Sequence, residues 1–401
     1  MPESRDPDPA AAGVADPALG LSLVRGDALF RLQRRVGLIP AHGLGLVRRA
    51  VFWSLFAWLP VVLWAIHAGR ALPGVPGEPL LAHFGIHARF LVAVPLLILA
   101  EGPVHAASTR LLGYFAASGV VPPAETGRFR AAVAATARLR DGTLPWIVIA
   151  GLVLGFTTTS EIVHHAHEID WADGGAGDGR WGFGALWYLY VGRSVYLTLV
   201  LAWLWRAVLL AVLLWRIARL DLALVPTHPD RAGGVGFLER VPPLFAPVVL
   251  GIGCVIASRW AHDAVYHGLA LQSLRVEMAA FVAAALAVFL LPLAAFAGPL
   301  MRAKRQALLD YGALVGRHGR LVRERWIEGK TVDDAVLGAP ELGPVADTVT
   351  AYEAVKAMRA VPVGKAAVVP LAAAAAAPMI ALLALQMPVK DLALALVKAL
   401  L

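Results

Sequence analysis

The chain contains 401 residues, of which 59% are hydrophobic and 16% are charged, and its formal net charge is +8 at pH 7. Its mean hydropathy of +0.67 excludes an ordinary soluble domain and indicates a multi-pass membrane protein. The basic residues lie beside the hydrophobic segments, so the positive charge predicts membrane topology and argues against a nucleic-acid partner. The single cysteine, Cys254, excludes an intramolecular disulfide and a CxxC metal motif.

The first forty residues contain no segment that predicts a membrane span. Residues 1–20 are rich in Ala, Pro and Asp, which predicts disorder, and we expect no cleaved signal peptide because no apolar core follows them. In residues 21–40, apolar side chains recur at helical spacing among arginines, which predicts a basic amphipathic helix. Two placements are open for this helix: on the cytoplasmic leaflet, or packed on the rest of the protein.

Seven hydrophobic segments follow. A transmembrane helix needs about 20 apolar residues, because backbone polar groups must pair within the helix where no water is available. We therefore predict an all-α fold, a polytopic integral membrane helical bundle of about seven transmembrane helices within a range of six to eight. Six of the segments form a membrane domain at 41–300. The seven segments lie at residues 50–68, 84–107, 144–164, 183–216, 243–267, 277–300 and 366–388.

Basic residues flank every second connection between these segments. They are frequent before the first segment, between the second and third, between the fourth and fifth, and after the sixth, whereas the connection after the third segment is acidic. Lys and Arg accumulate in cytoplasmic loops of membrane proteins. The alternation therefore predicts a cytoplasmic N-terminus.

The C-terminal quarter of the chain divides into a polar insertion and a last membrane segment. Residues 301–364 predict a cytoplasmic helical insertion, whose first helix continues the sixth span through Trp326. Residues 365–401 contain the last apolar segment and a tail. This segment carries Pro370 and Pro378, which leaves a kinked span and a re-entrant hairpin open. We favour a crossing, which places the C-terminus outside.

Two motifs mark the chain as similar to a known group. The loop after the fourth segment reads HPDRAGGVGFL at 228–238, and MRAVP at 358–362 precedes the last segment. With these motifs the chain resembles, over most of its length, a group of bacterial multi-pass membrane proteins of unassigned function. The resemblance implies a location in the bacterial inner (plasma) membrane. It implies no activity, cofactor or ligand.

The glycine-rich loop at 228–236 has two interpretations. Gly-rich backbone can cradle an anion, as phosphate-binding loops do. However, the loop lacks the GxxxxGK[ST] spacing and follows a membrane helix instead of a strand. A tight turn that returns the chain to the fifth span is therefore the favoured interpretation.

Histidines gather at the predicted outer ends of the spans. Pairs such as His83 with His87, and Glu161 with His165, are spaced i,i+4 and so place two ligand-capable side chains on one helix face. Imidazoles and carboxylates on facing helices bind Zn or Fe, so a transition-metal site is one hypothesis. The alternatives are histidines that only face water, and a sensor of external pH. The candidate metal ligands are His83, His87, Glu161, His164, His165, His262 and His267.

Charged residues inside the apolar segments provide a second set of candidates, because intramembrane charge is costly and marks function by default. Arg193 and Arg259 either line an aqueous cavity that accepts an anion or form structural ion pairs. Glu101 and His105, spaced i,i+4, either pass protons or bind a cation, or they mark where the helix leaves the membrane. The candidate polar lining of a transport path is Glu161, Arg193, Arg259, Asp263, Glu101 and His105.

These observations support three hypotheses for the function. The first is a channel or transporter for a small ion or solute, with a polar site in the outer half of the bundle. The second is a membrane-embedded metal-dependent enzyme that uses outer-face His, Glu and Asp, although no GxSxG or HExxH signature is present. The third is a scaffold or assembly protein whose insertion at 301–364 binds a partner. The lipid bilayer is a partner in all three, and a homo-oligomer is open.

Overall fold

In the computed structural model, residues 20–73, 78–159, 171, 182–332 and 345–384 are described. Within these ranges every regular element is a helix. Seven helical stretches among them are long and apolar enough to cross a bilayer, which confirms the predicted all-α bundle of about seven spans. The seven stretches are Leu46–His67, Phe84–Ala117, Pro123–Thr158, Phe183–Ala218, Gly236–Tyr266, Leu271–Trp326 and Lys365–Ala384.

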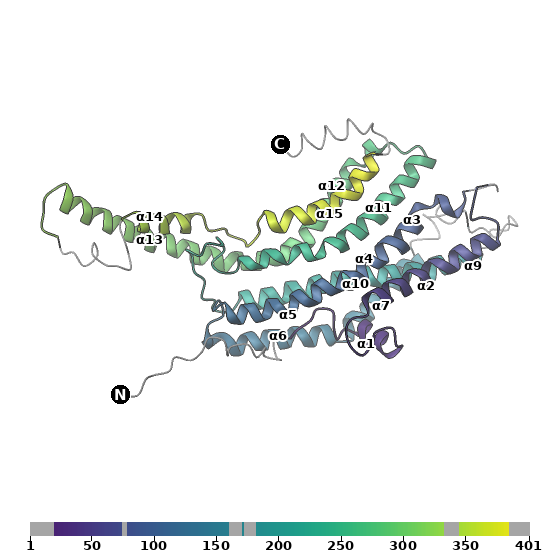
Figure 1. Cartoon of the computed structure of the whole chain (residues 1–401), viewed down its shortest axis with the longest axis horizontal. Helices are drawn as coiled ribbons and strands as arrows, with labels where there is room; N and C mark the ends of the chain where they lie inside the picture. Colours follow the sequence, from purple (N-terminus) through teal and green to yellow (C-terminus); the bar gives the residue numbers. More distant parts are fainter. Residues whose placement is uncertain (1–19, 74–77, 160–170, 172–181, 333–344, 385–401) are drawn as a thin grey trace.

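Figure 1 shows the arrangement of the helices. The α-helices are, in chain order, α1 (Ala28–Arg35), α2 (Leu46–His67), α3 (Phe84–His87), α4 (Val94–Leu99), α5 (Glu101–Ala117), α6 (Thr126–Asp141), α7 (Leu144–Thr159), α9 (Phe183–Leu186), α10 (Arg193–Ala218), α11 (Ala246–Tyr266), α12 (Arg275–Leu290), α13 (Ala297–Trp326), α14 (Val345–Lys356) and α15 (Lys365–Ala384). The 3-10 segments are η3 (Leu80–Ala82), η5 (Pro123–Glu125), η8 (Gly236–Arg240), η9 (Pro242–Phe245), η10 (Leu271–Leu274) and η11 (Leu291–Phe296), and two segments are π-helical, η4 (Ala88–Ala93) and η7 (Trp187–Gly192).

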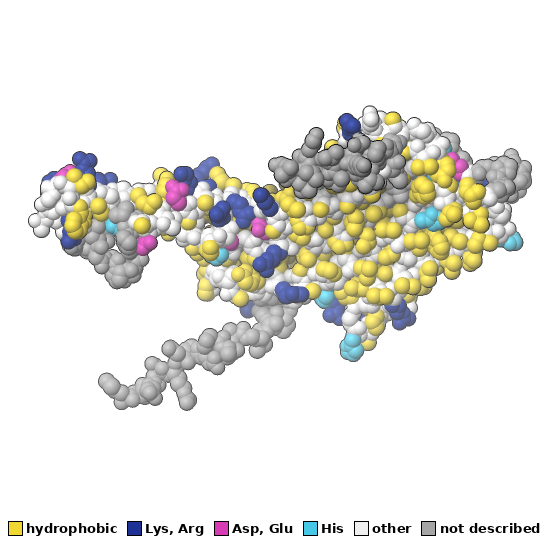
Figure 2. Space-filling view, turned by 45° about the horizontal axis from the view of Figure 1, so that its top comes forward, with side chains coloured by type: hydrophobic (Ala, Val, Ile, Leu, Met, Phe, Trp, Pro, Cys, Tyr) yellow, Lys and Arg dark blue, Asp and Glu magenta, His cyan; other side chains and the backbone are white. Residues whose placement is uncertain are grey.

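The first span shows how the sequence separates a lipid-facing side from a packed side. On α2, the large side chains of Val51, Leu55 and Leu59 are exposed, whereas the small Ala57 and Ala65 are buried. Small residues let neighbouring helices approach closely, and large apolar residues face hydrocarbon without cost. The same division gives the bundle a broad hydrophobic surface, which Figure 2 shows in yellow. The spans therefore contact the lipid bilayer.

Two packing arrangements position the functional residues. α10 packs against α6, α7 and η11, and its buried Trp203 donates an indole N–H to the Leu97 carbonyl at 2.9 Å. α11 packs against α15 on one side and against α3 and η4 on the other. Because α3 begins and α11 ends at the same end of the bundle, side chains at these two termini meet (Figure 1).

The segment before α1 is part of the core. Leu21, Leu23 and Val24 are buried, and the buried Asp27 caps α1 by accepting the Phe30 backbone N–H at 2.7 Å. Of the two placements open for residues 21–40, these contacts favour packing on the protein.

The insertion after the sixth span is an arm that projects from the bundle (Figure 1). α13 continues from the membrane region and packs along α14. It ends at Trp326, which is also the predicted end of the first helix of this insertion. After the arm, α15 passes without a break through Pro370 and Pro378. This continuous helix of 20 residues favours a crossing over a hairpin within Lys365–Ala384.

Candidate metal centre

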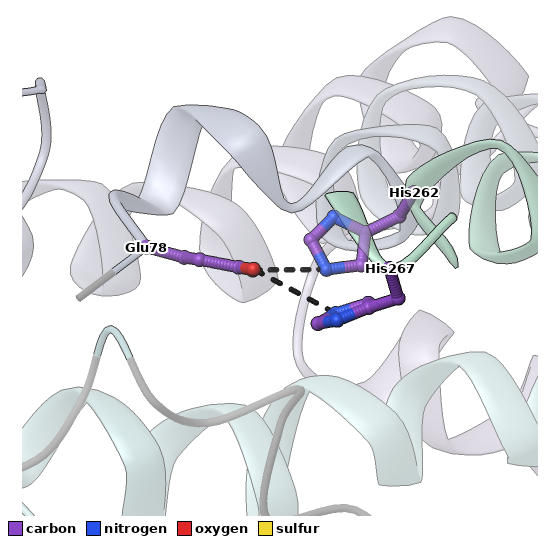
Figure 3. A group of neighbouring side chains, drawn as sticks. All are labelled: Glu78, His262 and His267. Carbon is purple, nitrogen blue, oxygen red and sulfur yellow. Dashed lines mark ion pairs between the residues drawn. The ribbon is translucent and has the colours of Figure 1, made fainter. Parts of the chain in front are cut away.

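Four side chains meet where α3 begins and α11 ends (Figure 3 draws three of them). We call Glu78, His83, His262 and His267 the His–Glu cluster. Glu78 comes just before Pro79 and η3, and His83 is the residue that precedes α3. His262 lies in the last turns of α11, and His267 follows the helix as its cap, where its backbone N–H bonds the Asp263 carbonyl at 3.0 Å.

The carboxylate of Glu78 lies between two imidazoles. Its Oε2 is 3.0 Å from His262 Nε2, and its Oε1 is 3.6 Å from His267 Nε2. One ligand atom from each of the three residues lies within 4.8 Å of the others. Ligand atoms placed about 2.0–2.1 Å from a tetrahedral zinc ion lie roughly 3.3 Å apart. The separations of 3.0 and 3.6 Å lie on either side of this value, although each involves a different oxygen of Glu78, and the ligand atoms spread up to 4.8 Å must close in to share one ion.

The hydrogen bond on the far side of the His262 ring fixes what its Nε2 can do. Nδ1 lies 3.0 Å from the carbonyl oxygen of Ala82, which only accepts, so Nδ1 carries a proton. In the neutral ring Nε2 then presents a lone pair to the carboxylate oxygen of Glu78. Two acceptors at 3.0 Å attract each other only if a proton or a metal ion stands between them. A ring N–H that donates to a backbone carbonyl is also the arrangement that orients histidines bound to metals.

His83 borders the same cluster. Its ring stacks on the His262 ring with centroids 4.8 Å apart, and its Nε2 lies 3.9 Å from Glu78 Oε2. The side chain is buried, which keeps the stacked pair away from solvent on that face. His83 therefore borders the centre, but at 3.9 Å its Nε2 lies beyond direct hydrogen-bond distance of the carboxylate.

The structure brings together only part of the predicted metal set. His83, His262 and His267 converge as the sequence suggested. His87 does not belong to the cluster: its Nδ1 accepts the Trp58 indole N–H at 3.0 Å and its Nε2 lies 3.2 Å from the Leu80 carbonyl. The predicted ligands Glu161, His164 and His165 lie outside the described residues.

Glu78 is the ligand that the sequence reasoning missed. It lies in the Gly-Glu-Pro connection five residues before His83, where no helical period relates it to a histidine. One signal could have identified Glu78 as a ligand: it is an acid close in sequence to His83, at the predicted outer end of the second span.

The residues proposed as a polar lining differ in exposure, and Glu161 lies outside the described residues. Arg259 is exposed, and Asp263 and Arg193 are partly buried. His105 Nδ1 lies 2.7 Å from the Ser22 hydroxyl. Glu101 belongs to a separate buried group described next.

We call Asp27, Arg49, Glu101 and Arg206 the ion-pair network. Arg206 Nη2 donates to Glu101 Oε1 at 2.9 Å and to Asp27 Oδ2 at 3.0 Å, and Arg49 donates to Glu101 Oε2. With the Phe30 N–H on Asp27 Oδ1, all four carboxylate oxygens accept a hydrogen bond. None of the four charged side chains is more than 3% exposed.

The network has no net charge, because two arginines balance two acids. Arg206 also lies over the ring of Trp203, with 4.8 Å from its Cζ to the ring centroid. The network links the N-cap of α1 to α2, α5 and α10, so its arrangement is that of a structural ion-pair set. For Glu101 this geometry supports a structural part over a transport lining.

Comparison of the chain with protein-family models, with curated proteins and with solved structures finds no match.

Proposed function

We propose that this protein binds a transition-metal ion, best matched by zinc, at Glu78, His262 and His267. One observation carries the proposal: the Nε2 of His262 faces the Glu78 carboxylate at 3.0 Å while its Nδ1 is committed to the Ala82 carbonyl. A cation is the group that such an arrangement of acceptors attracts. A donor set of two imidazoles and one carboxylate is typical of zinc sites.

The class of activity that fits this centre is metal-dependent hydrolysis or a related use of a metal-activated water. Two His and one Glu supply three protein ligands, and catalytic zinc sites keep a fourth position for water or substrate. His83 lies 3.9 Å from the carboxylate, so it would exchange a proton there only through a bridging water. This supports the membrane-embedded metal-dependent enzyme among the three hypotheses. The channel or transporter has less support at Glu101, because both oxygens of this carboxylate are bound to arginines of the ion-pair network.

The proposal includes a location for the centre. Basic side chains gather at the end of the bundle from which α13 extends (Figure 2), which supports a cytoplasmic placement of that end. The His–Glu cluster lies at the other end. We therefore place it on the outer side of a bacterial inner membrane, with the N-terminus in the cytoplasm.

Zinc titration of the purified, tag-free protein in detergent tests the proposal. Isothermal calorimetry should give one saturable zinc site per chain, and Co²⁺ in its place should give the visible absorption of a tetrahedral complex. Glu78→Gln and His262→Ala should each weaken zinc binding at least about tenfold, since even changes to groups that only orient metal ligands cost about 10–100-fold. The matched control is His42→Ala, which removes an exposed histidine distant in sequence from the cluster.

Two outcomes would overturn the proposal. One is a wild-type protein that takes up less than a tenth of an equivalent of zinc. The other is equal zinc affinity in the wild type and in His262→Ala. A Glu78–His262 pair bridged by a proton would produce both outcomes. In that case Co²⁺ added to the protein would also give the same absorption spectrum as Co²⁺ in buffer alone.

A further inference from the structure

The two motifs at 228–238 and 358–362 form one structural unit, although more than a hundred residues separate them. The backbone N–H of Arg359 donates to the Arg231 carbonyl at 2.7 Å, and its Nη2 donates to the Asp230 carbonyl at 3.0 Å. Its Nη1 donates to Glu239 at 2.9 Å. Arg359 thus binds the second motif to the first by two hydrogen bonds, and a third goes to Glu239, the residue that follows the first motif.

Asp230 organises the loop of the first motif. Its carboxylate accepts the backbone N–H groups of Ala232, Gly234 and Gly236 at 2.8, 3.2 and 2.8 Å. A Cβ at Gly236 would come within 2.7 Å of Asp230, so only glycine fits there. Of the two interpretations of this glycine-rich loop, the backbone donors support a turn, because they bind the chain's own carboxylate.

This unit forms one wall of a cleft of about 780 Å³. The opposite wall is α5, and the apolar floor includes Leu111, Val241 and Leu244. The aromatic rings of Tyr114 and Phe237 meet edge to face on one side, with centroids 4.6 Å apart. Pockets for small ligands typically enclose about 300–1,000 Å³ and combine apolar walls with a few polar groups.

The charges at this cleft are not matched in pairs. Glu239 is paired with Arg359, and the Asp230 carboxylate is occupied by backbone donors. Arg110 and Arg240 also line the cleft and are exposed, and within the described residues neither forms an ion pair with an acid. Two guanidinium groups therefore present positive charge to the cleft, while both acids are already bound.

We propose that this cleft binds a phosphate-bearing ligand, with Arg110 and Arg240 as the phosphate ligands. Guanidinium groups match the geometry of phosphate oxygens with two parallel N–H donors each. The apolar floor and the Tyr114–Phe237 pair accommodate the organic part of the ligand. The same chemistry comes from two sources: the headgroup of an anionic phospholipid, or a soluble phosphate ester. The site is separate from the His–Glu cluster and does not depend on it.

The test compares Arg110→Gln/Arg240→Gln with Arg317→Gln/Arg320→Gln, a pair of exposed arginines on α13 that serves as the matched control. Two probes separate the sources. Phosphatidylglycerol is presented in nanodiscs against a phosphatidylcholine background and detected by native mass spectrometry. Glycerol 3-phosphate is titrated in detergent by calorimetry. Circular dichroism and gel-filtration profiles of each variant report whether it is folded.

At least one probe should bind the wild type, and the Arg110/Arg240 variant should bind it at least tenfold more weakly, with the control pair within twofold. If the wild type binds phosphatidylglycerol but not glycerol 3-phosphate, the ligand is a lipid headgroup. If it binds glycerol 3-phosphate but not phosphatidylglycerol, the ligand is a soluble phosphate ester. The proposal is overturned if neither probe binds the wild type, or if the control pair loses as much affinity. Should the double variant not fold, Arg110→Lys/Arg240→Lys keeps the charge but removes the paired donors, and it must still weaken the probe.

Discussion

The ion-pair network inside the bundle and the His–Glu cluster at its end differ in how their donors and acceptors match. In the ion-pair network, two arginines meet two acids, and all four carboxylate oxygens accept N–H groups. In the His–Glu cluster, one carboxylate meets three imidazoles, and the Nε2 of His262 offers a lone pair to an oxygen. All the carboxylate oxygens of the first group have N–H donors, whereas in the second group a proton or a metal ion must stand between His262 and Glu78.

This difference in hydrogen-bond matching distinguishes a structural role from a ligand-binding role better than burial does. Both Glu101 and His83 are buried, so low exposure alone would give them the same role. The acceptors distinguish the two groups. In the neutral network every carboxylate oxygen already accepts an N–H group, although Arg206 Nε and Nη1 have no hydrogen-bond partner among the described residues. The predictions below test this distinction, beginning with the largest expected effect.

Arg206→Met should destabilise the protein by about 3–5 kcal/mol, because the buried Asp27 and Glu101 carboxylates then lose a charged partner. The change will appear as a large fall in the thermal unfolding temperature in detergent, or as loss of the monodisperse gel-filtration peak. The control Arg305→Met replaces an exposed arginine and should change stability by less than about 0.5 kcal/mol.

A double-variant cycle sharpens this prediction. Asp27→Asn keeps the cap on α1 but removes the charge that faces Arg206, so it should cost less in the Arg206→Met background than in the wild type. If the two substitutions add without coupling, the network is not one electrostatic unit.

Zinc at a hundred times its dissociation constant should stabilise the wild type by about 2.7 kcal/mol, since a ligand that binds only the folded state adds this amount. His262→Ala should show no such gain, yet its unfolding temperature without zinc should fall far less than that of Arg206→Met. Thermal unfolding with and without zinc checks both statements. A His262→Ala variant as unstable as Arg206→Met would mean that the cluster is structural.

Asp230→Asn should lower stability by about 1–2 kcal/mol at pH 7, because the ionised carboxylate accepts backbone N–H groups at the cleft wall. Partial burial raises the pKa of Asp230, but the three backbone donors and His228 outweigh this and hold that pKa below its usual value. The carboxylate therefore contributes its stability above the usual pKa of about 3.9 and loses it as the pH falls through the lower folded value. Unfolding temperatures of wild type and variant should accordingly converge in acid. A constant difference down to pH 3 would contradict this.

His87→Gln should leave zinc affinity within about threefold of the wild type, because both nitrogens of this ring are bonded to Trp58 and Leu80. Calorimetric titration beside His262→Ala measures the contrast. A tenfold loss of zinc affinity in His87→Gln would mean that His87 is a metal ligand. It would also mean that satisfied hydrogen bonds do not distinguish structural residues from ligands.

The fold was predictable because its signals are local. A run of apolar residues long enough to span a bilayer identifies a helix without knowledge of its neighbours, and the helix that ends at Trp326 follows from its own sequence. Single charged residues were harder to interpret. Arg206 lies in the same predicted span as Arg193 and carries the same signal, but its role depends on Asp27, which is 179 residues away.

The site was predictable only where histidines follow helical periods. His262 and His267 were selected at the outer end of the fifth span, whereas Glu78 lies in an irregular Gly-Pro connection without periodicity. The pairing of α3 with α11 decides which residues meet, and nothing in either segment specifies the other. For the same reason the bond between Arg359 and Arg231 could not be read from the two motifs separately.

The burial of Asp27 against Arg206 has a consequence for biogenesis. The acid is near the start of the chain, but its counter-ion emerges from the ribosome only with the fourth span. Until then the segment that contains Asp27 lacks the ion pair between Asp27 and Arg206, so Asp27 reaches its final position only after the fourth span has been made. A nascent chain arrested after the third span should therefore leave this segment open to protease, and one arrested after the fourth should protect it.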